Sequence, residues 1–414
     1  MRKIRPTWWF PLSEDINSAL GGRVGSHVRA STATYEHPVT ELVTVANTDI
    51  PRFENVGGKN ALLVEPVGTN LCLQREQFDS GTWGKAFSST SANAATAPDG
   101  NVTADKLIED GTAASTHYIQ QGIAEATFTD NVSIAFTTYV KQGERTWVHL
   151  RARTKANTYG GCYFDLANGV VGTATGGATG TIVSASNGFY RCRISFNIST
   201  GATLPLFFIF IAEADSTITY DGDGSSGIYL WGAQIEEFPV PTSYMQDNDN
   251  PASTVSRATE SGYSSYVLPA GIFNVKGTLI LWARSGAAYG SFPAGDYGLI
   301  SSADAAKSLL YFDEGGNICT FDGTNETLHN VNWPINTWRK YGLKWDASQS
   351  KVWVGADTGS GISWTEGTFD NVYTEGANLR LGYGLYAPLH FKDIQIYNRL
   401  LSDTIFNQAT GKVQ

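Results

Sequence analysis

The chain has 414 residues, more than one typical domain needs, so we expect two or three domains, each with its own core. Its 12% aromatic and 42% hydrophobic residues exclude an intrinsically disordered protein. The net charge of −10, without any basic stripe interleaved with aromatic residues, argues against nucleic acid as a partner.

Residues 1–70 are predicted to form an irregular N-terminal arm, because five prolines interrupt any long element there. Such a segment buries little against itself, so we expect it to lie on another domain, another subunit or a larger assembly. Three adjacent aromatic residues, Trp8, Trp9 and Phe10, are our candidate anchor, since they would be a liability if exposed on a monomer. The alternative is that they fold back onto the first globular domain.

Residues 71–243 are predicted to form an antiparallel β-sandwich of the jelly-roll type. Residues 132–140, 146–153 and 190–196 alternate between apolar and polar side chains, as half-buried strands do. Residues 204–211 are continuously apolar and fit a central strand. The longest apolar run of the chain, residues 204–212, is too short to cross a membrane, so we expect no membrane insertion.

Residues 244–258 are predicted to form a linker, because Asx residues and prolines do not continue a sheet. Residues 259–414 again contain short strands, and residues 402–409 are predicted to form a short helix with Ser402 as its cap. The predicted fold class is therefore all-β: an extended arm followed by two antiparallel β-sandwiches.

Catalytic and metal-binding motifs are mostly missing, so we expect no enzyme activity, no cofactor and no metal. The sequence from Asp221 to Ser225 starts like a calcium loop, but Gly232 stands where such a loop needs a bidentate acid, which favours a tight turn. Four acids lie close in sequence without the spacing of sandwich glycosidases, which favours solvated turn acids over catalysis: Asp313, Glu314, Asp322 and Glu326. The four cysteines, Cys72, Cys162, Cys192 and Cys319, are predicted to be buried free thiols.

Aromatic residues in turns are candidates for contact with sugars, whose C–H faces stack on aromatic rings. The candidates for glycan binding lie in the second sandwich: Trp333, Trp364, Tyr373, Tyr383 and Tyr386. Packing in the core is the alternative for them. Tryptophans inside predicted strands are expected to pack between sheets: Trp147, Trp231, Trp282, Trp338, Trp345 and Trp353.

An ordered set of segments resembles a module that recurs in virion proteins of tailed bacteriophages. The head of that module is matched by RASTATY at 29–35, IPRF at 50–53, LLVEPVGTNL at 62–71 and QFDSGTW at 77–83. The rest is matched by YVKQGE at 139–144, GFYR at 188–191, IYLWGAQIE at 228–236 and PTSY at 241–244. The resemblance covers about residues 24–260 and implies a jelly roll of carbohydrate-binding-module type. Within the chain itself, Arg29-Ala-Ser-Thr and Arg257-Ala-Thr-Glu resemble each other.

The second sandwich is similar to laminin-G-like, concanavalin-type domains at WRKYGLKWD (338–346), LRLGY (379–383) and IQIYNRLLS (394–402). This similarity implies glycan or protein binding.

Together the resemblances imply a non-enzymatic structural protein of a tailed-phage virion, such as a fibre, spike or head-tail appendage. We expect the arm to bind other virion proteins. We expect the protein to form a homo-oligomer, with a trimer favoured, and to bind a host-surface glycan as a further partner. The alternatives are a dedicated glycan-binding adhesin and a polysaccharide depolymerase.

Overall fold

A computed structural model of the chain describes residues 6, 8–10, 25–56, 58–247, 250–260, 265–267, 275–286, 297–301, 308–331, 334, 336–370, 378–383 and 387–408. The chain divides into two compact units. Unit 1 comprises Met1–Thr32, Ala46–Val67 and Ala258–Gln414, and unit 2 comprises Ala33–Val45 and Gly68–Arg257.

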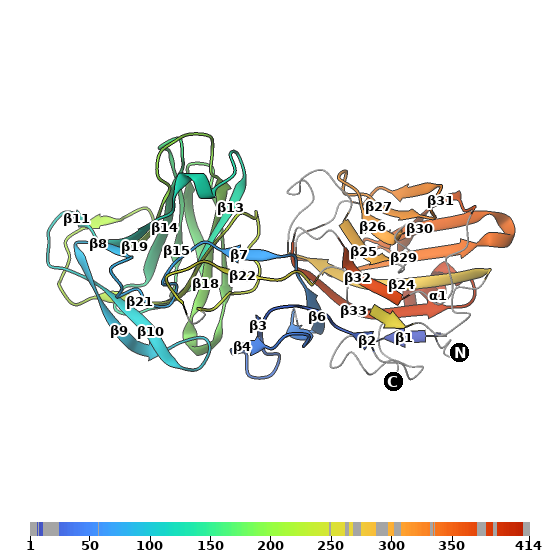
Figure 1. Cartoon of the computed structure of the whole chain (residues 1–414), viewed down its shortest axis with the longest axis horizontal. Coiled ribbons are helices and arrows are strands. Elements are labelled where there is room, and N and C mark those ends of the chain that lie inside the picture. Colours follow the sequence, from blue (N-terminus) through green and yellow to red (C-terminus); the bar gives the residue numbers. More distant parts are fainter. Residues whose placement is uncertain are drawn as a thin grey trace. The chain divides into compact units, whose positions relative to one another are not determined.

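Both units consist of antiparallel β-sheets, which confirms the predicted all-β fold class (Figure 1). Within the described part of the chain, α1 (Asp403–Gln408) is the only α-helix. The described residues include no helix with the length and apolar character needed to span a bilayer.

Unit 2 is a sandwich of two six-stranded sheets, as the alternating sequence predicts. The first, the β13 sheet, has the order β17-β18-β13-β21-β10-β9 and is formed by Thr179–Ser184, Tyr190–Asn197, Ser133–Gln142, Gly227–Glu236, Val102–Glu109 and Ser88–Thr96. The second, the β14 sheet, has the order β16-β15-β14-β19-β12-β8 and is formed by Val170–Thr175, Tyr159–Asp165, Trp147–Arg153, Leu206–Ala212, Tyr118–Gly122 and Gly84–Ala86.

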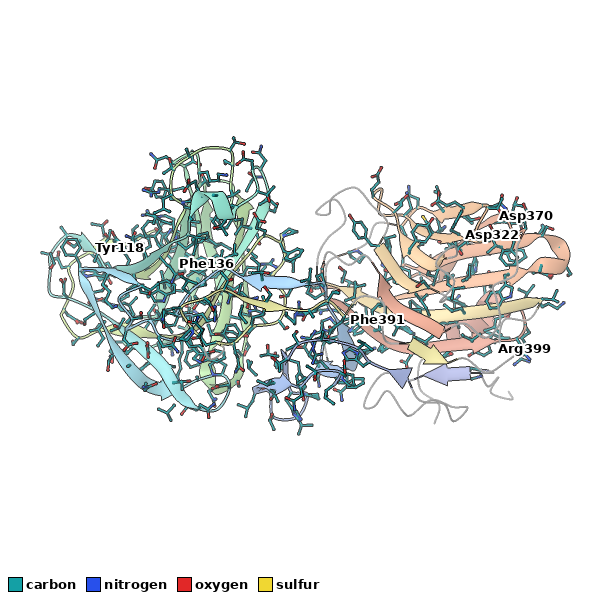
Figure 2. All side chains as sticks on the ribbon, in the orientation of Figure 1. Tyr118, Phe136, Asp322, Asp370, Phe391 and Arg399 are labelled. Carbon is teal, nitrogen blue, oxygen red and sulfur yellow. The ribbon has the colours of Figure 1, made fainter. Side chains whose placement is uncertain are left out.

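The core of unit 2 lies between these sheets. Phe136 (Figure 2) of the β13 sheet and Leu150, Phe207 and Ile209 of the β14 sheet belong to one cluster of fully buried side chains. Because side chains alternate along a strand, the neighbours of these residues point to the outer faces of the sandwich.

The outer face of the β13 sheet is covered by a second apolar cluster. Its three large rings contact one another. The ring centroids of Trp231 and Tyr244 are 4.7 Å apart, those of Tyr139 and Trp231 are 5.3 Å apart, and those of Tyr139 and Tyr244 are 5.9 Å apart. The strands β3 (Ala33–Glu36) and β4 (Val43–Ala46) form a small ribbon, and Val43 belongs to the same cluster.

Residues 244–257, expected to form a linker, are instead built into unit 2 wherever they are described. The Tyr244 hydroxyl donates to Glu76, and the backbone N–H of Met245 donates to Gln234. Strand β22 (Val255–Arg257) pairs with β7 (Gly68–Asn70). The polar residues of this segment find hydrogen-bond partners in the sandwich, which sequence composition does not reveal.

Unit 1 contains an eight-stranded and a seven-stranded sheet. The larger has the order β31-β30-β29-β24-β33-β6-β5, formed by Ile362–Thr368, Lys351–Asp357, Arg339–Asp346, Lys276–Ser285, Leu389–Tyr397, Asn60–Val64 and Arg52–Asn55, and β1 (Trp8–Phe10) also pairs with β33. The smaller has the order β2-β23-β32-β25-β26-β27-β28, formed by Gly25–Ser26, Ser265–Val267, Asn378–Tyr383, Tyr297–Ser301, Ser308–Phe312, Ile318–Phe321 and Glu326–His329.

Those of the first 70 residues that the structure describes therefore do not form a separate arm. Strand β6 pairs with the first half of β33, with Leu62 opposite Phe391 (Figure 2), and β1 pairs with the second half of the same strand. Trp8, Trp9 and Phe10, the candidate anchor, lie opposite Ile396, Gln395 and Ile394. The prolines interrupt local structure here, but β33, more than 300 residues later in the sequence, supplies the backbone partners.

Four charged side chains of unit 1, which we call the buried ion cluster, are fully shielded from solvent: Arg29, Arg52, Glu65 and Glu260. Glu260 accepts from Arg29 through one carboxylate oxygen (2.7 Å) and from Arg52 through the other (2.5 Å). Arg52 also pairs with Glu65 at 2.7 Å. The cluster joins the sequence motifs RAST, IPRF, LVEP and RATE, so these motifs have a shared structural role.

Removing one charge from this cluster should strongly destabilise unit 1. In Glu260→Gln, the buried Arg29 loses this carboxylate partner and the buried Arg52 keeps the pair with Glu65, and breaking a buried pair in this way costs about 3–5 kcal/mol. We expect a correspondingly lower free energy of unfolding in denaturant titrations. The control is Glu366→Gln, which breaks the exposed pair with Lys351 and should leave the unfolding midpoint nearly unchanged. Equal effects of the two substitutions would contradict the structural role of the cluster.

Candidate functional site

The outer face of the β14 sheet carries an unusual density of aromatic side chains. On β14, Val148, Leu150 and Ala152 belong to the core, so the alternate residues of this strand point outward. The same alternation holds on β12, β15 and β19. The outward side chains form what we call the platform: Tyr118, Trp147, His149, Arg151, Tyr159, Tyr163, Phe208 and Phe210.

One row of the platform is aromatic across four adjacent strands. The strand register places Tyr163, His149, Phe210 and Tyr118 side by side. The His149 ring stacks on Tyr163 with centroids 4.0 Å apart, and Phe210 lies 4.7 Å from Tyr118. This row forms a continuous ring surface at right angles to the strands.

The next row carries the polar groups of the platform. It runs from Gly161 through Arg151 and Phe208 to Gln120. Neither the Gln120 side-chain amide nor the Arg151 guanidinium has a hydrogen-bond partner among the described residues, and the Arg151 Nε is itself buried. Donors and an acceptor are therefore available beside the aromatic row.

Gly161 leaves the space that this arrangement needs. A Cβ atom there would lie 2.6 Å from the Leu150 carbonyl oxygen and 2.8 Å from Cε1 of His149. Because the carbonyl belongs to the neighbouring strand, it cannot move away without breaking the sheet. A side chain at this position would displace His149 from its stack on Tyr163.

The platform has a buried floor and an accessible rim. Phe208 and Phe210 are buried, whereas Tyr118 and Trp147 are half-buried and Tyr159 is 45% exposed. Large apolar groups that remain accessible on a sheet face mark an interaction surface. Flat rings beside unpaired polar groups can stack on a ligand and hydrogen-bond to it at the same time.

The electrostatics of the platform centre on Arg151 and His149. The Arg151 guanidinium carbon lies 4.4 Å from the ring centroid of Phe210, 5.1 Å from that of Phe208 and 4.9 Å from that of Tyr159. Burial lowers the pKa of Arg151, and burial together with the Arg151 charge lowers the pKa of His149 to about 3. His149 is therefore neutral near pH 7, and its buried Nδ1 has no hydrogen-bond partner among the described residues.

The shifted pKa of His149 should make unit 2 sensitive to acid. The unfolded chain takes up a proton at His149 below its ordinary pKa of 6.5, whereas the folded state resists it down to about pH 3. The free energy of unfolding should therefore fall as pH drops through this window, by at most about 1.4 kcal/mol per pH unit.

The substitution His149→Phe keeps a ring on Tyr163 and removes the titrating group. We expect the variant to lose less stability than the wild type between pH 6.5 and pH 4 in denaturant titrations, because other acid-sensitive groups are common to both proteins. Parallel stability curves would show that His149 is not held neutral by its surroundings.

Of the predicted glycan-binding residues, Trp364 is the one whose side chain the structure describes. It lies on the outer face of the eight-stranded sheet, against α1. Its ring is 5.0 Å from that of Phe406, its Nε1 donates to Asp403 (2.9 Å), and the Lys344 ammonium lies 4.1 Å from its ring centroid. These contacts give Trp364 a packing role, and a glycan contact there stays a prediction.

The other predicted glycan-binding residues are not placed by side-chain contacts. Tyr383 ends β32, with its backbone opposite Gly298. Trp333, Tyr373 and Tyr386 lie outside the described residues.

The strand tryptophans divide between core and outer faces. Trp345 lies in the core of unit 1, and Trp231 is buried, although in the cluster outside the β13 sheet. Trp147, Trp282 and Trp353 are half-buried on outer faces, so the expectation that they pack between sheets is wrong. Trp282 lies between Lys340 and Lys392 of the flanking strands, with their ammonium groups 5.5 and 4.8 Å from its ring centroid.

The predicted turn acids are confirmed only in part. Asp223 accepts from the backbone and hydroxyl groups of Ser225 and Ser226, which confirms the predicted turn. Asp313 and Asp322 accept backbone N–H groups of their own turns, but Asp322 is buried rather than solvated and Glu326 lies in strand β28 (Glu326–His329). The described residues hold no group of three His, Cys, Asp or Glu side chains arranged to bind a metal ion. The four cysteines are free and buried, as predicted.

Sequence reasoning missed the platform, although its signal was present. Strand β14 has Trp147, His149 and Arg151 on one face, and β19 has Phe208 and Phe210. The prediction treated residues 204–211 only as a continuously apolar central strand, because the outward Phe208 and Phe210 make that side of the strand as apolar as its inward side.

Comparison with known proteins gives distant structural matches. No family model and no curated protein matches the chain. Among solved structures, Trypanosoma rangeli sialidase aligns over 99% of this chain and 98% of its own, with 11% identity and a TM-score of 0.27. The N-terminal CBM22-1-CBM22-2 tandem domain of Xyn10C from Paenibacillus barcinonensis aligns over 80% of this chain and 98% of its own, with 12% identity and a TM-score of 0.25.

The botulinum neurotoxin serotype D binding domain aligns with 13% identity and a TM-score of 0.29, over 35% of this chain. That alignment spans 39% of the toxin domain's own length. At such low TM-scores these matches carry no functional argument, so the function must be argued from the platform itself.

Proposed function

We propose that this protein is a non-enzymatic structural component of a tailed-phage virion, a fibre, spike or head-tail appendage, and that unit 2 binds host-surface glycans through the platform. The glycan part depends on one observation: the accessible rim residues Tyr118, Trp147 and Tyr159 lie around unpaired polar groups on the outer face of a rigid sheet. The virion part depends on the sequence resemblance over about residues 24–260.

The platform has the features that sugar recognition requires. A sugar ring has an apolar C–H face that stacks on aromatic rings, and the rim residues Tyr159, Tyr118 and Trp147 offer such rings. Its hydroxyls need donors and acceptors, which Arg151 and Gln120 supply in the adjacent row. Because the groups lie on paired strands, little ordering is needed on binding, which favours affinity.

Removing a rim ring should weaken glycan binding while the fold is kept. On a glycan array and in affinity electrophoresis, we expect Tyr159→Ala and Trp147→Ala to bind about tenfold more weakly than wild type, since each loses a stacking contact worth about 1 kcal/mol or more. The matched control is Tyr229→Ala, a half-buried tyrosine on the β13 sheet. If Trp364→Ala abolishes binding and the platform variants do not, unit 1 is the glycan-binding unit and the platform assignment is wrong.

The virion assignment predicts incorporation into particles through the N-terminal segment. Removing residues 1–24, which include Trp8, Trp9 and Phe10, should abolish incorporation while leaving unit 2 folded, because none of these residues belongs to unit 2.

Imaging of virions labelled at the carboxyl terminus should locate the protein, and light scattering should give a trimer. Unchanged incorporation would contradict the anchor, and a monomer would contradict the homotrimer.

Two alternatives make different predictions. A dedicated adhesin would bind host glycan without being part of a particle. A depolymerase would release reducing ends from purified capsule or lipopolysaccharide. The turn positions of Asp313 and Asp322 favour the non-enzymatic proposal, since both carboxylates are used to hold their own loops.

A further inference from the structure

We infer that the glycan bound by the platform is acidic, and that Arg151 binds its carboxylate. This inference rests on the proposed function, because it names the class of sugar that the same surface would take. It comes from a closer look at one of the unpaired polar groups, the Arg151 side chain.

The Arg151 guanidinium presents its donors without an acceptor. Its Nε is buried and has no partner, and no described residue forms a hydrogen bond or an ion pair with the rest of the group. Its neighbours are the rings of Phe208, Phe210 and Tyr159, which attract the cation but accept no ordinary hydrogen bond. A buried donor without an acceptor carries a desolvation cost that a suitable ligand would remove.

Two arginines of unit 2, the half-buried Arg145 and the buried Arg75, show what this position lacks. Arg145 donates to both carboxylate oxygens of Glu109, at 2.9 and 2.6 Å, and Arg75 pairs with Asp247. Arg151 has no such carboxylate among the described residues. A ligand carboxylate would accept hydrogen bonds from the Arg151 guanidinium, as the Glu109 carboxylate accepts them from Arg145.

The acids nearest to the platform are already engaged. Asp215 accepts from the backbone N–H and the hydroxyl of Thr173, both at 2.9 Å. Asp165 accepts from the backbone and side chain of Asn168. Since both carboxylates are held by loops, the charge of Arg151 remains available to a ligand.

The chemistry of the group selects a carboxylate over a neutral hydroxyl. A guanidinium is a planar fork that matches a carboxylate with two parallel hydrogen bonds, and such charged bonds are roughly twice as strong as neutral ones. The surrounding rings exclude water and strengthen the pair. A uronate or sialate ring stacked on Tyr159 would bring its carboxylate and its C–H face to adjacent parts of the platform.

The test compares polymers that differ only in their carboxylates. The probes are polygalacturonate and polysialic acid, each before and after chemical reduction of the carboxyl groups, together with dextran sulfate as a general polyanion. The proteins are wild type, Arg151→Gln, Arg151→Lys and Tyr159→Ala. The matched control is Arg153→Gln, which removes the same charge two residues along β14 from a side chain that donates to the Leu204 carbonyl. Thermal unfolding verifies that each variant is folded.

We expect wild type to bind at least one carboxylate polymer about tenfold or more tightly than its reduced form at physiological salt. Arg151→Gln should abolish that preference, Arg151→Lys should keep part of it, and Arg153→Gln should keep it. Equal binding of native and reduced polymers, equal loss in Arg153→Gln, or equally tight binding of dextran sulfate would overturn the inference.

The two proposals fail in different ways. Binding of neutral or reduced polymers that is lost in Tyr159→Ala but not in Arg151→Gln would leave the glycan-binding function intact and refute the acidic ligand. Binding of no polymer in this set or on a glycan array would refute the glycan-binding function, and the inference with it.

Discussion

The buried ion cluster is the constraint on which unit 1 depends. Buried charges are stabilised only when their oppositely charged partners are present. Here the partners come from three separate stretches of sequence, and Arg29 and Glu260 lie 231 residues apart. No subset of these stretches can satisfy the cluster. Unit 1 therefore requires residue 260 before its first strands can be held in place, which gives its folding a strongly non-local character.

The two outer faces of the unit 2 sandwich differ in what covers them. On the β13 sheet, Tyr244 and Val43 cover Trp231, so the aromatic residues there become a second core. On the β14 sheet, Arg151 lies over the rings of Phe208 and Phe210, and Tyr159, the most exposed aromatic residue of the platform, lies at its rim. The same residue types thus stabilise one face and leave the other available for a ligand. Which face is covered is decided by segments distant in sequence, not by the strands themselves.

This difference marks the limit of prediction from sequence. Local periodicity located the strands well: residues 132–140 were expected and β13 is Ser133–Gln142. It could not show that β6 pairs with both β5 and β33, because pairing partners leave no local pattern. For the same reason, it placed Trp147 in the core: alternation shows that a strand has two faces but not which face is inward. The turns around Asp223 and Asp313 were predictable because their chemistry is local.

The interleaving of the two units has a consequence for how such a protein can evolve. The chain passes between units after residues 32, 45, 67 and 257, so residues 33–45 serve unit 2 while residues 46–67 serve unit 1. A recombination event that exchanged residues 68–257 alone would leave Trp231 without the Val43 strand that covers it. Inheritance of the head motifs and the jelly roll as one block is thereby favoured, while the outward residues of β12, β14, β15 and β19 can change by point substitution without disturbing that block.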